Sequence, residues 1–238
     1  MNSARPWPTL VVASALTLVC AVAAGVAGSA AGTELTRGPS TAELHAAAKR
    51  EVAERWRTWP AGRIFPATLP YSAEQGGQER ARRIGISPHT SCDSVDAKAA
   101  KALRKAGCRG LLRATYIDAL RGVLVTVGVA ALRDELGAVR AKSAFAESGE
   151  PVPGLRPLAF ANTIAHRFTP AVRQAGSVRQ AGPYLVLTTA GEVDGRPGSA
   201  VGEPRPAIFA FATEISERVL TGLSTPRMPD CAAEEWQC

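Results

Sequence analysis

The sequence predicts an α+β fold, namely an antiparallel sheet of about five or six strands with helices packed on one face, preceded by one N-terminal transmembrane helix. The transmembrane helix is indicated by the run from Pro6 to Thr33, which carries no charge, whereas charges recur every few residues after Glu34. The sheet is indicated by β-rich runs that Gly and Pro residues separate. Helical segments lie between these runs instead of following every strand, which favours α+β.

The N-terminal apolar run predicts export. A membrane span needs about 20 apolar residues, and residues 9–31 meet this requirement. Cleavage of a signal peptide after Ala30 or Ala31 is the alternative, but only Arg5 supplies a cationic n-region. We therefore expect residues 1–8 to be cytoplasmic and the span to stay uncleaved. The exported part then consists of a linker at 32–40, a domain at 41–225 and a Cys-containing tail at 226–238.

The domain begins with a helix from Thr41 to Trp59, where apolar residues recur at helical spacing. Thr41 is expected to cap this helix, and Pro60 ends it. The run from Arg63 to Leu69 predicts a short strand, and Pro66 within it favours an edge of the sheet. Residues 75–83 are polar and predict a loop or a short helix.

The segment from Ser91 to Glu147 gives the most regular pattern. Ser91 or Asp93 is expected to cap a helix that ends at Gly107. Two strands follow, Gly110–Ile117 and Val123–Ala131, joined by a five-residue connection whose Gly122 suits a positive φ. The second strand is apolar on both faces, as a central strand must be. A helix is then expected over Leu132–Ala146, with Leu132, Leu136 and Val139 in helical register.

The last third predicts three further strands, Leu158–Ala165, Pro183–Ala190 and Ala207–Thr213, and a closing helix over Ile215–Leu223. Between residues 172 and 183 the chain repeats a hexapeptide, VRQAGS and then VRQAGP. Six residues are too few for a structural repeat, so this segment is interpreted as a loop duplication.

The cysteines beyond the apolar run form an even set, which in an exported chain predicts two disulfides. They are Cys92, Cys108, Cys231 and Cys238. No metal site is expected, because the set lacks tight C-x-x-C pairs. All three pairings stay open, and we favour 92–108 with 231–238 because short loops close at the lowest entropic cost. A helix from Asp93 would hold Cys92 and Cys108 about 20 Å apart, so that bridge requires the helix to begin near Asp96.

The formal net charge of +7 excludes little, and a solvated basic surface is the first interpretation. One helix face nevertheless gathers four cations opposite its apolar stripe, without an aromatic side chain that would stack on a nucleic-acid base. This basic face consists of Lys98, Lys101, Arg104 and Lys105. We expect at most a weak electrostatic contact with an anionic envelope surface, and no nucleic acid as a partner.

The sequence motifs predict no catalytic residue and no cofactor. The sequence has no G-x-S-x-G, no G-x-x-x-x-G-K and no H-E-x-x-H motif. His89 lies near Ser91 and Asp93, but triad partners converge from separate segments, so this cluster is interpreted as loop and capping chemistry.

Several blocks resemble single-pass envelope proteins of high-GC actinobacteria. They are RWRTWPAGRIFPATLPY (55–71), GISPHTSC (85–92), GCRGLLRATYID (107–118) and LVTVGVAAL (124–132). A fainter likeness is to the extracellular sensor domains of actinobacterial Ser/Thr kinases, which are α+β and disulfide-bonded. Either resemblance implies an extracytoplasmic interaction domain and transfers no catalytic residue.

These observations predict a membrane-tethered extracytoplasmic binding or assembly module of the cell envelope, without catalytic activity. Its expected partners are the bilayer, through residues 9–31, and an envelope protein or an anionic envelope polymer. The alternative is an exported hydrolase whose active site the sequence does not reveal. A pocket that gathers His89 or His166 with a carboxylate would favour the hydrolase.

Overall fold

A computed structural model describes residues 7–73, 75–146, 149–197 and 210–229 of the chain. The chain divides into two compact units, with the boundary between Ala46 and Ala47 inside helix α2. The larger unit, residues 47–228, holds the whole sheet.

Helix α1 (Trp7–Thr36) contains the apolar segment Val11–Ser29, which is long and apolar enough to cross a membrane. The segment coincides with the span expected at 9–31. Its length, composition and N-terminal position fit a retained anchor and a signal sequence alike.

Helix α2 (Thr41–Thr58) confirms the expected helix over 41–59, but Ser40 caps it instead of Thr41. The Ser40 hydroxyl accepts from the Glu43 N–H, and the Glu43 carboxylate accepts from the Ser40 N–H at 2.8 Å. This reciprocal pair is a capping box. Arg37 donates to the same carboxylate, and its hydrogen bond is the main reason why the pKa of Glu43 is lowered.

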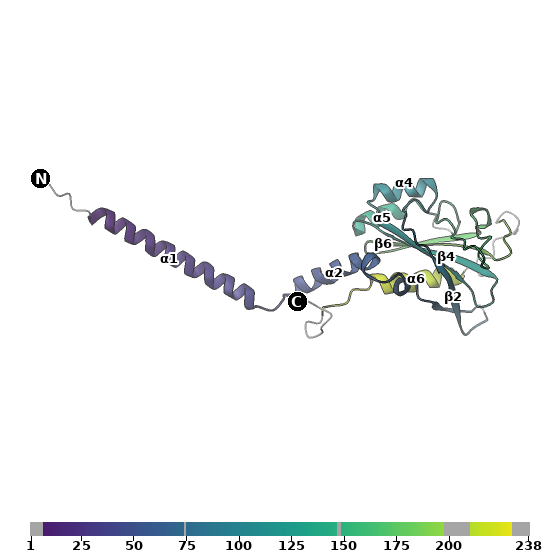
Figure 1. Ribbon diagram of the computed structural model, residues 1–238, viewed down its shortest axis with the longest axis horizontal. Helices are drawn as coiled ribbons and strands as arrows, with labels where there is room; N and C mark the ends of the chain where they lie inside the picture. Colours follow the sequence, from purple (N-terminus) through teal and green to yellow (C-terminus); the bar gives the residue numbers. More distant parts are fainter. Residues whose placement is uncertain (1–6, 74, 147–148, 198–209, 230–238) are drawn as a thin grey trace. The chain divides into compact units, whose positions relative to one another are not determined.

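The sheet confirms the predicted class. It has six antiparallel strands in the order β1-β2-β3-β4-β6-β5 (Figure 1). The outer strands are β1 (Thr68–Ser72), β2 (Gln78–Ile86) and β5 (Ala175–Ala181). The central strands are β3 (Gly110–Ile117), β4 (Val123–Ala131) and β6 (Tyr184–Glu192), and the bounds of β3 and β4 are those predicted. Every residue of β4 is buried, as expected for a central strand.

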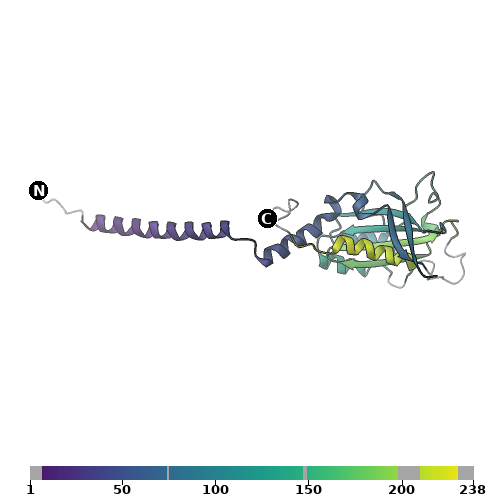
Figure 2. The same ribbon diagram turned by 90° about the horizontal axis from the view of Figure 1, so that it is seen from below.

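The sheet curls around helix α6 (Ala210–Ser224), which contacts both edge strands as well as β6 (Figure 2). Glu214 of α6 accepts from the N–H of Ser72 in β1 at 2.8 Å, and Glu217 pairs with Arg179 of β5 at 3.0 Å. Between helix and sheet lies a core that includes Phe65, the four valines of β4 and Ile215. The two glutamates therefore hold opposite edges of the sheet to one helix.

Helices cover both faces of the sheet, whereas one face was expected. Helices α4 (Ala97–Lys105) and α5 (Glu135–Lys142) lie on the side opposite α6 (Figure 1). Their buried side chains join those of Leu111, Ala130 and Leu187 in a second core. The reason is that the central strands are apolar on both faces, and each face must be covered. Helix α5 is shorter than predicted and buries its small residues, so Leu136 and Val139 are exposed.

Helix α4 begins where a bridge between Cys92 and Cys108 requires it. Asp96 is the N-cap, and the two cysteine Cα atoms lie 6.4 Å apart in a disulfide, so this predicted pairing is confirmed. The Asp96 carboxylate does not cap the helix, but accepts from the Gly154 N–H and from Arg173, both at 2.8 Å. Gly107, at φ 78°, ends the helix as expected.

Two expectations near the start of the domain are wrong. The segment 63–69 is not one strand, because Pro60 starts a helical turn, α3 (Ala61–Ile64), and β1 begins only at Thr68. The edge position was nevertheless right, and β1 accommodates Pro70 there. The polar segment 75–83 is neither loop nor helix in its second half. It enters β2, where Ala81 is buried and the flanking arginines face solvent.

Three expectations in the last third are also wrong. Residues 158–165 are not a strand, because the backbone of Leu158 bonds to the side chains of Thr115 (2.7 Å) and Thr126 (2.9 Å) instead of to a neighbouring strand. The expected strand 207–213 becomes helix from Ala210, and residues 207–209 lie outside the described residues. The second copy of the repeated hexapeptide is not a loop, since it forms most of β5.

Candidate ligand-binding pocket

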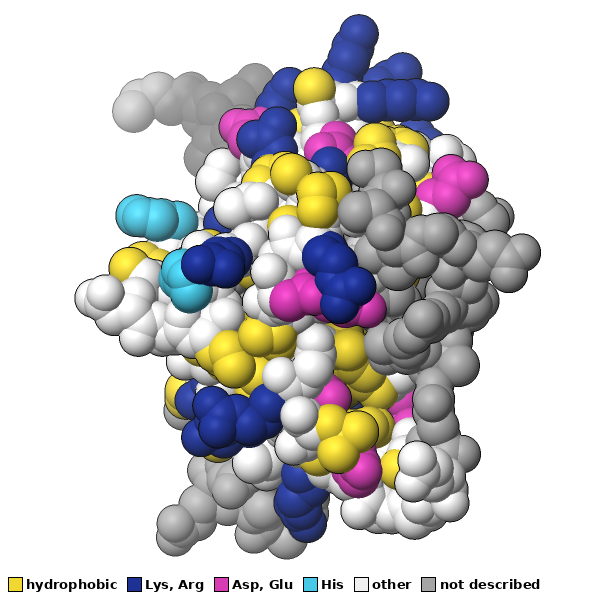
Figure 3. Space-filling model, turned by 90° about the vertical axis from the view of Figure 1, so that its right-hand side faces the viewer, with side chains coloured by type: hydrophobic (Ala, Val, Ile, Leu, Met, Phe, Trp, Pro, Cys, Tyr) yellow, Lys and Arg dark blue, Asp and Glu magenta, His cyan; other side chains and the backbone are white. Residues whose placement is uncertain are grey.

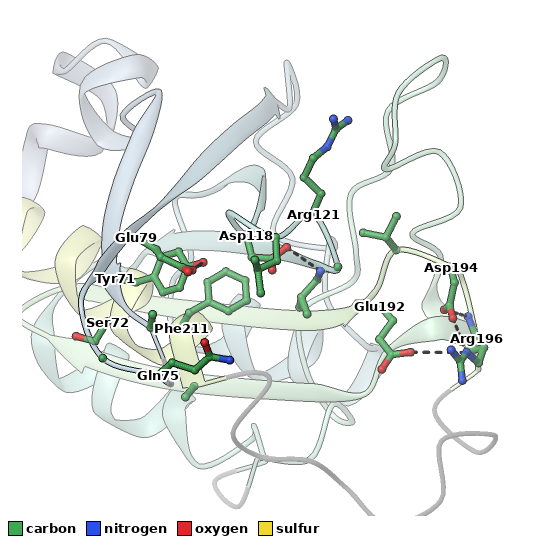
Figure 4. A pocket seen from close by; sticks show the side chains of 17 residues that line it. Tyr71, Ser72, Gln75, Glu79, Asp118, Arg121, Glu192, Asp194, Arg196 and Phe211 are labelled. Carbon is green, nitrogen blue, oxygen red and sulfur yellow. Dashed lines mark hydrogen bonds and ion pairs between the residues drawn. The ribbon is translucent and has the colours of Figure 1, made fainter.

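An open pocket of about 840 Å³ lies at the end of the sheet where β3 turns into β4 (Figure 4). Its walls come from four segments that are distant in sequence. These are the β1–β2 turn, the β3–β4 turn, the end of β6 with the residues after it, and the first turn of α6. Figure 3 views the domain from the right-hand side of Figure 1, where exposed hydrophobic side chains lie between acidic and basic ones.

Two buried aromatic rings form one wall of the pocket. The ring centroids of Tyr71 and Phe211 lie 5.0 Å apart, with the ring planes at 43°. The Tyr71 hydroxyl donates to the Glu79 carboxylate and accepts from the Ala119 N–H at 3.1 Å. The hydroxyl thereby ties the β1–β2 hairpin to the β3–β4 turn.

Burial and two acidic neighbours keep Tyr71 neutral. Burial is the larger cause and raises the pKa of Tyr71 to about 12, with a further increase from the hydrogen bond to Glu79. The charges of Glu79 and Asp118 act in the same direction. The Tyr71 hydroxyl is therefore a fixed donor at physiological pH, set in a negative potential.

Asp118 closes the turn between β3 and β4. Its Oδ1 accepts from the Val123 N–H at 2.9 Å, and its carbonyl oxygen accepts from Arg121 N–H at 3.2 Å. The positive φ expected at Gly122 falls on Arg121 instead, at 59°. Although Asp118 is only 8% exposed, it lines the pocket.

The charges at the other side of the pocket are largely balanced. Arg196 pairs with Asp194 and lies 3.8 Å from Glu192. The pKa of Asp194 is lowered, first by the Arg196 N–H and then by its guanidinium. The side chain of Arg121 extends away from Tyr71 and Phe211 (Figure 4). None of the ion pairs among the described residues includes Glu79 or Asp118.

The structure places the predicted site residues away from this pocket. The disulfide between Cys92 and Cys108 joins the segment before α4 to the segment after it. The four residues of the basic face are exposed on α4, and Arg104 pairs with Asp93. The second expected pair, Cys231 and Cys238, lies outside the described residues.

Neither His89 nor His166 lines the pocket. The His166 ring nitrogen Nδ1 lies 2.9 Å from the Thr163 carbonyl oxygen. Near His89, the Ser91 hydroxyl accepts from the Asp93 N–H at 3.2 Å, which is the loop chemistry expected of that cluster. Among the described residues, no group of three His, Cys, Asp or Glu side chains is placed to hold a metal ion.

Sequence reasoning missed the residues that shape the pocket, above all Tyr71, Glu79, Asp118 and Phe211. One signal was present, because Asp118 begins the turn between two predicted strands, the second of which is apolar on both faces. The others carried none, since the first strand was expected to end at Leu69, before Tyr71, and β2 and the first turn of α6 were not recognised.

No family model, curated protein or solved structure matches this chain. What the fold defines is therefore a class: a disulfide-stapled α+β domain that follows a candidate membrane span. The resemblance to actinobacterial envelope proteins stays a prediction.

Proposed function

We propose that this protein is a membrane-tethered extracytoplasmic binding module of the cell envelope, and that its ligand site is the pocket between Tyr71, Asp118 and Phe211. The observation that carries the proposal is the pocket itself. It is of the size that small-molecule sites have, and it combines a largely apolar wall with a few placed polar groups.

The apolar segment of α1 and the Cys92–Cys108 bridge support the compartment. With the N-terminus inside, the span would place the following domain outside the membrane, and disulfides persist in oxidising compartments. Release after cleavage would leave the same domain on the same side of the membrane.

The bonding of the pocket residues supports recognition. Tyr71 and Asp118 are each held by a backbone N–H and Arg196 by carboxylates, so the polar groups are fixed before a ligand arrives. A preformed site loses little conformational entropy when it binds. No contact in the described residues specifically favours the hydrolase alternative.

The basic face supports at most a weak second contact, with an anionic envelope surface. Its Lys98, Lys101 and Lys105 are free of ion pairs among the described residues, whereas Arg104 is partly neutralised by Asp93. Replacing all four cations with Gln should abolish binding of the full chain, held in zwitterionic nanodiscs, to anionic vesicles at low salt. If the native chain does not bind at low salt, the face is only solvated.

Three measurements test the proposed function, two on intact cells and one on isolated membranes. Protease added outside should remove the domain, and carbonate extraction should leave the protein in the membrane. A photo-crosslinking residue at Leu120, which is 81% exposed and lines the pocket, should form an adduct. The matched control is the same residue at Thr221, exposed near the other end of α6. A protected domain, or equal labelling at both positions, would contradict the proposal.

A further inference from the structure

We infer that this pocket binds an organic cation, an ammonium or guanidinium group carried on an apolar body, with Glu79 and Asp118 as its charge partners. The inference rests on the proposed function, because it names the ligand class of the same pocket. It follows from a buried carboxylate with a free oxygen, from the local sign of charge and from the aromatic wall.

The first observation behind this inference is the environment of the Asp118 carboxylate. Asp118 is a buried residue, and its Oδ1 accepts from the Val123 N–H. Among the described residues nothing donates to Oδ2, and no cation pairs with the carboxylate. A carboxylate that the protein partly shields from water attracts a cation more strongly than one in bulk solvent. Oδ2 is not among the buried atoms that lack a partner, and Asp118 lines the pocket, so a cationic group in the pocket can reach this oxygen.

Glu79 supplies a second carboxylate beside the first. Its Oε2 accepts from the Tyr71 hydroxyl, and no residue in the described ranges donates to Oε1. The Tyr71 hydroxyl bonds to Glu79 and also to the N–H of Ala119, the residue after Asp118, so both carboxylates belong to the same part of the pocket wall. A single cationic group beside that part of the wall would be attracted by both.

The local charge is opposite to that of the whole chain. The formal net charge is +7, yet the wall around Tyr71 carries two carboxylates and no cation (Figure 4). Arg196 is taken up by Asp194 and Glu192, and Arg121 extends away from the wall. An anionic ligand would therefore meet uncompensated carboxylates.

The apolar surface of the pocket indicates that the ligand carries an apolar group next to its cationic group. Tyr71 and Phe211 present ring surface, and Leu120, Val123 and Val193 complete the apolar lining. Aromatic faces attract cations as well as apolar groups. A bare metal ion fits poorly, because the described residues place no three suitable ligands together.

The test uses two probes that differ only in charge. They are Nα-acetyl-lysine methylamide and the same compound acetylated at Nζ. Binding to the full chain in zwitterionic nanodiscs is measured by calorimetry and by ligand-observed NMR. We expect the charged probe to bind at least about tenfold more tightly than the neutral one, and its affinity to fall with added salt.

Two variants locate the binding. Asp118→Asn keeps the oxygen that accepts from Val123, and Glu79→Gln keeps an acceptor for Tyr71, so both remove charge and preserve the turn. Each should weaken the charged probe about tenfold. Asp93→Asn, an exposed carboxylate on α4's flank, is the matched control and should leave the affinity unchanged. If one variant fails to fold, the affinity of the other for the charged probe still tests the inference.

The outcomes separate this inference from the proposed function. Equal affinity for both probes, no binding of either, or unchanged affinity in Asp118→Asn and Glu79→Gln would each overturn the cation inference. If Leu120 still forms its adduct in cells, the binding function stands with a different ligand class. Loss of that adduct would overturn the function itself.

Discussion

We expect Arg55 to stabilise the domain more than its other charged residues do, and replacing Arg55 with Met tests this expectation. The side chain is 1% exposed, and Nη1 donates to the carbonyl oxygens of Leu223 (2.9 Å), Thr225 (2.8 Å) and Gly222 (3.3 Å) at the end of α6. Its Nε donates to Glu51 at 2.8 Å. Arg55 therefore neutralises the negative end of α6 from within α2.

The expected loss of unfolding free energy in Arg55→Met is about 3 kcal/mol. Removing one partner of a buried ion pair costs about 3–5 kcal/mol, and Met recovers part of the packing. Gly222 and Thr225 are exposed, so water can replace the guanidinium at their carbonyl groups, while that of the buried Leu223 has no such substitute. Glu51 is partly exposed and can be hydrated as well. The loss of unfolding free energy is therefore expected at the lower end of the range of about 3–5 kcal/mol.

Urea unfolding of the full chain in mild detergent, followed by tryptophan fluorescence, measures this loss. Trp59 is a suitable reporter because the Arg55 guanidinium lies 4.6 Å from its ring centroid. Arg57→Met is the matched control, since Arg57 is exposed on the same helix and pairs with Glu54. If the Arg55 and Arg57 variants unfold at the same urea concentration, the assigned role of Arg55 is wrong.

Three further predictions concern stability. Reducing the Cys92–Cys108 bridge, whose cysteines are 16 residues apart, should lower the unfolding free energy by about 3 kcal/mol, and unchanged urea midpoints with and without reductant would refute this. Gly110→Ala should cost about 1–3 kcal/mol, because a Cβ there would lie 2.7 Å from the Trp56 ring; calorimetry that shows no lower Tm would contradict it. Burial raises the pKa of every tyrosine, to about 12 at two of them, so absorbance at 295 nm should show no phenolate near pH 10 in the folded protein. The contribution of the three neutral tyrosines to stability should be fully present below about pH 10, the unfolded pKa, and should be lost as the pH rises through the folded values. The residues are Tyr71, Tyr116 and Tyr184.

The central strands could be predicted because burial on both faces leaves an unbroken apolar run. Val123–Ala131 has such a run, and its bounds were right. In contrast, β2 has one partly solvated face rich in arginine, and a polar segment of that kind resembles a loop until its neighbours are known. The start of α6 is rich in Ala and Phe, and Phe211, Ile215 and Val219 reveal their helical spacing only when the segment is not divided at Thr213.

The pocket could not be predicted, because its residues share no motif and little sequence proximity. Tyr71 and Phe211 are 140 positions apart and meet only because the sheet curls around α6. Asp118 was placed in the turn between two predicted strands, but its burial depends on the segments that fold against it. The amino-acid composition does not indicate a pocket with unpaired carboxylates, because the chain as a whole is basic.

The contact between Arg55 and the end of α6 also constrains the order in which the chain can fold. Arg55 and Leu223 are 168 positions apart, so the first helix of the domain meets its partner only after almost the whole chain has been synthesised. Until then α2 carries a guanidinium without the carbonyl groups that receive it, and Val52 lacks the core that α6 completes. A domain that is exported in the order of its sequence would therefore keep α2 undocked until its last helix arrives, and nascent chains that end before Ala210 should remain sensitive to protease.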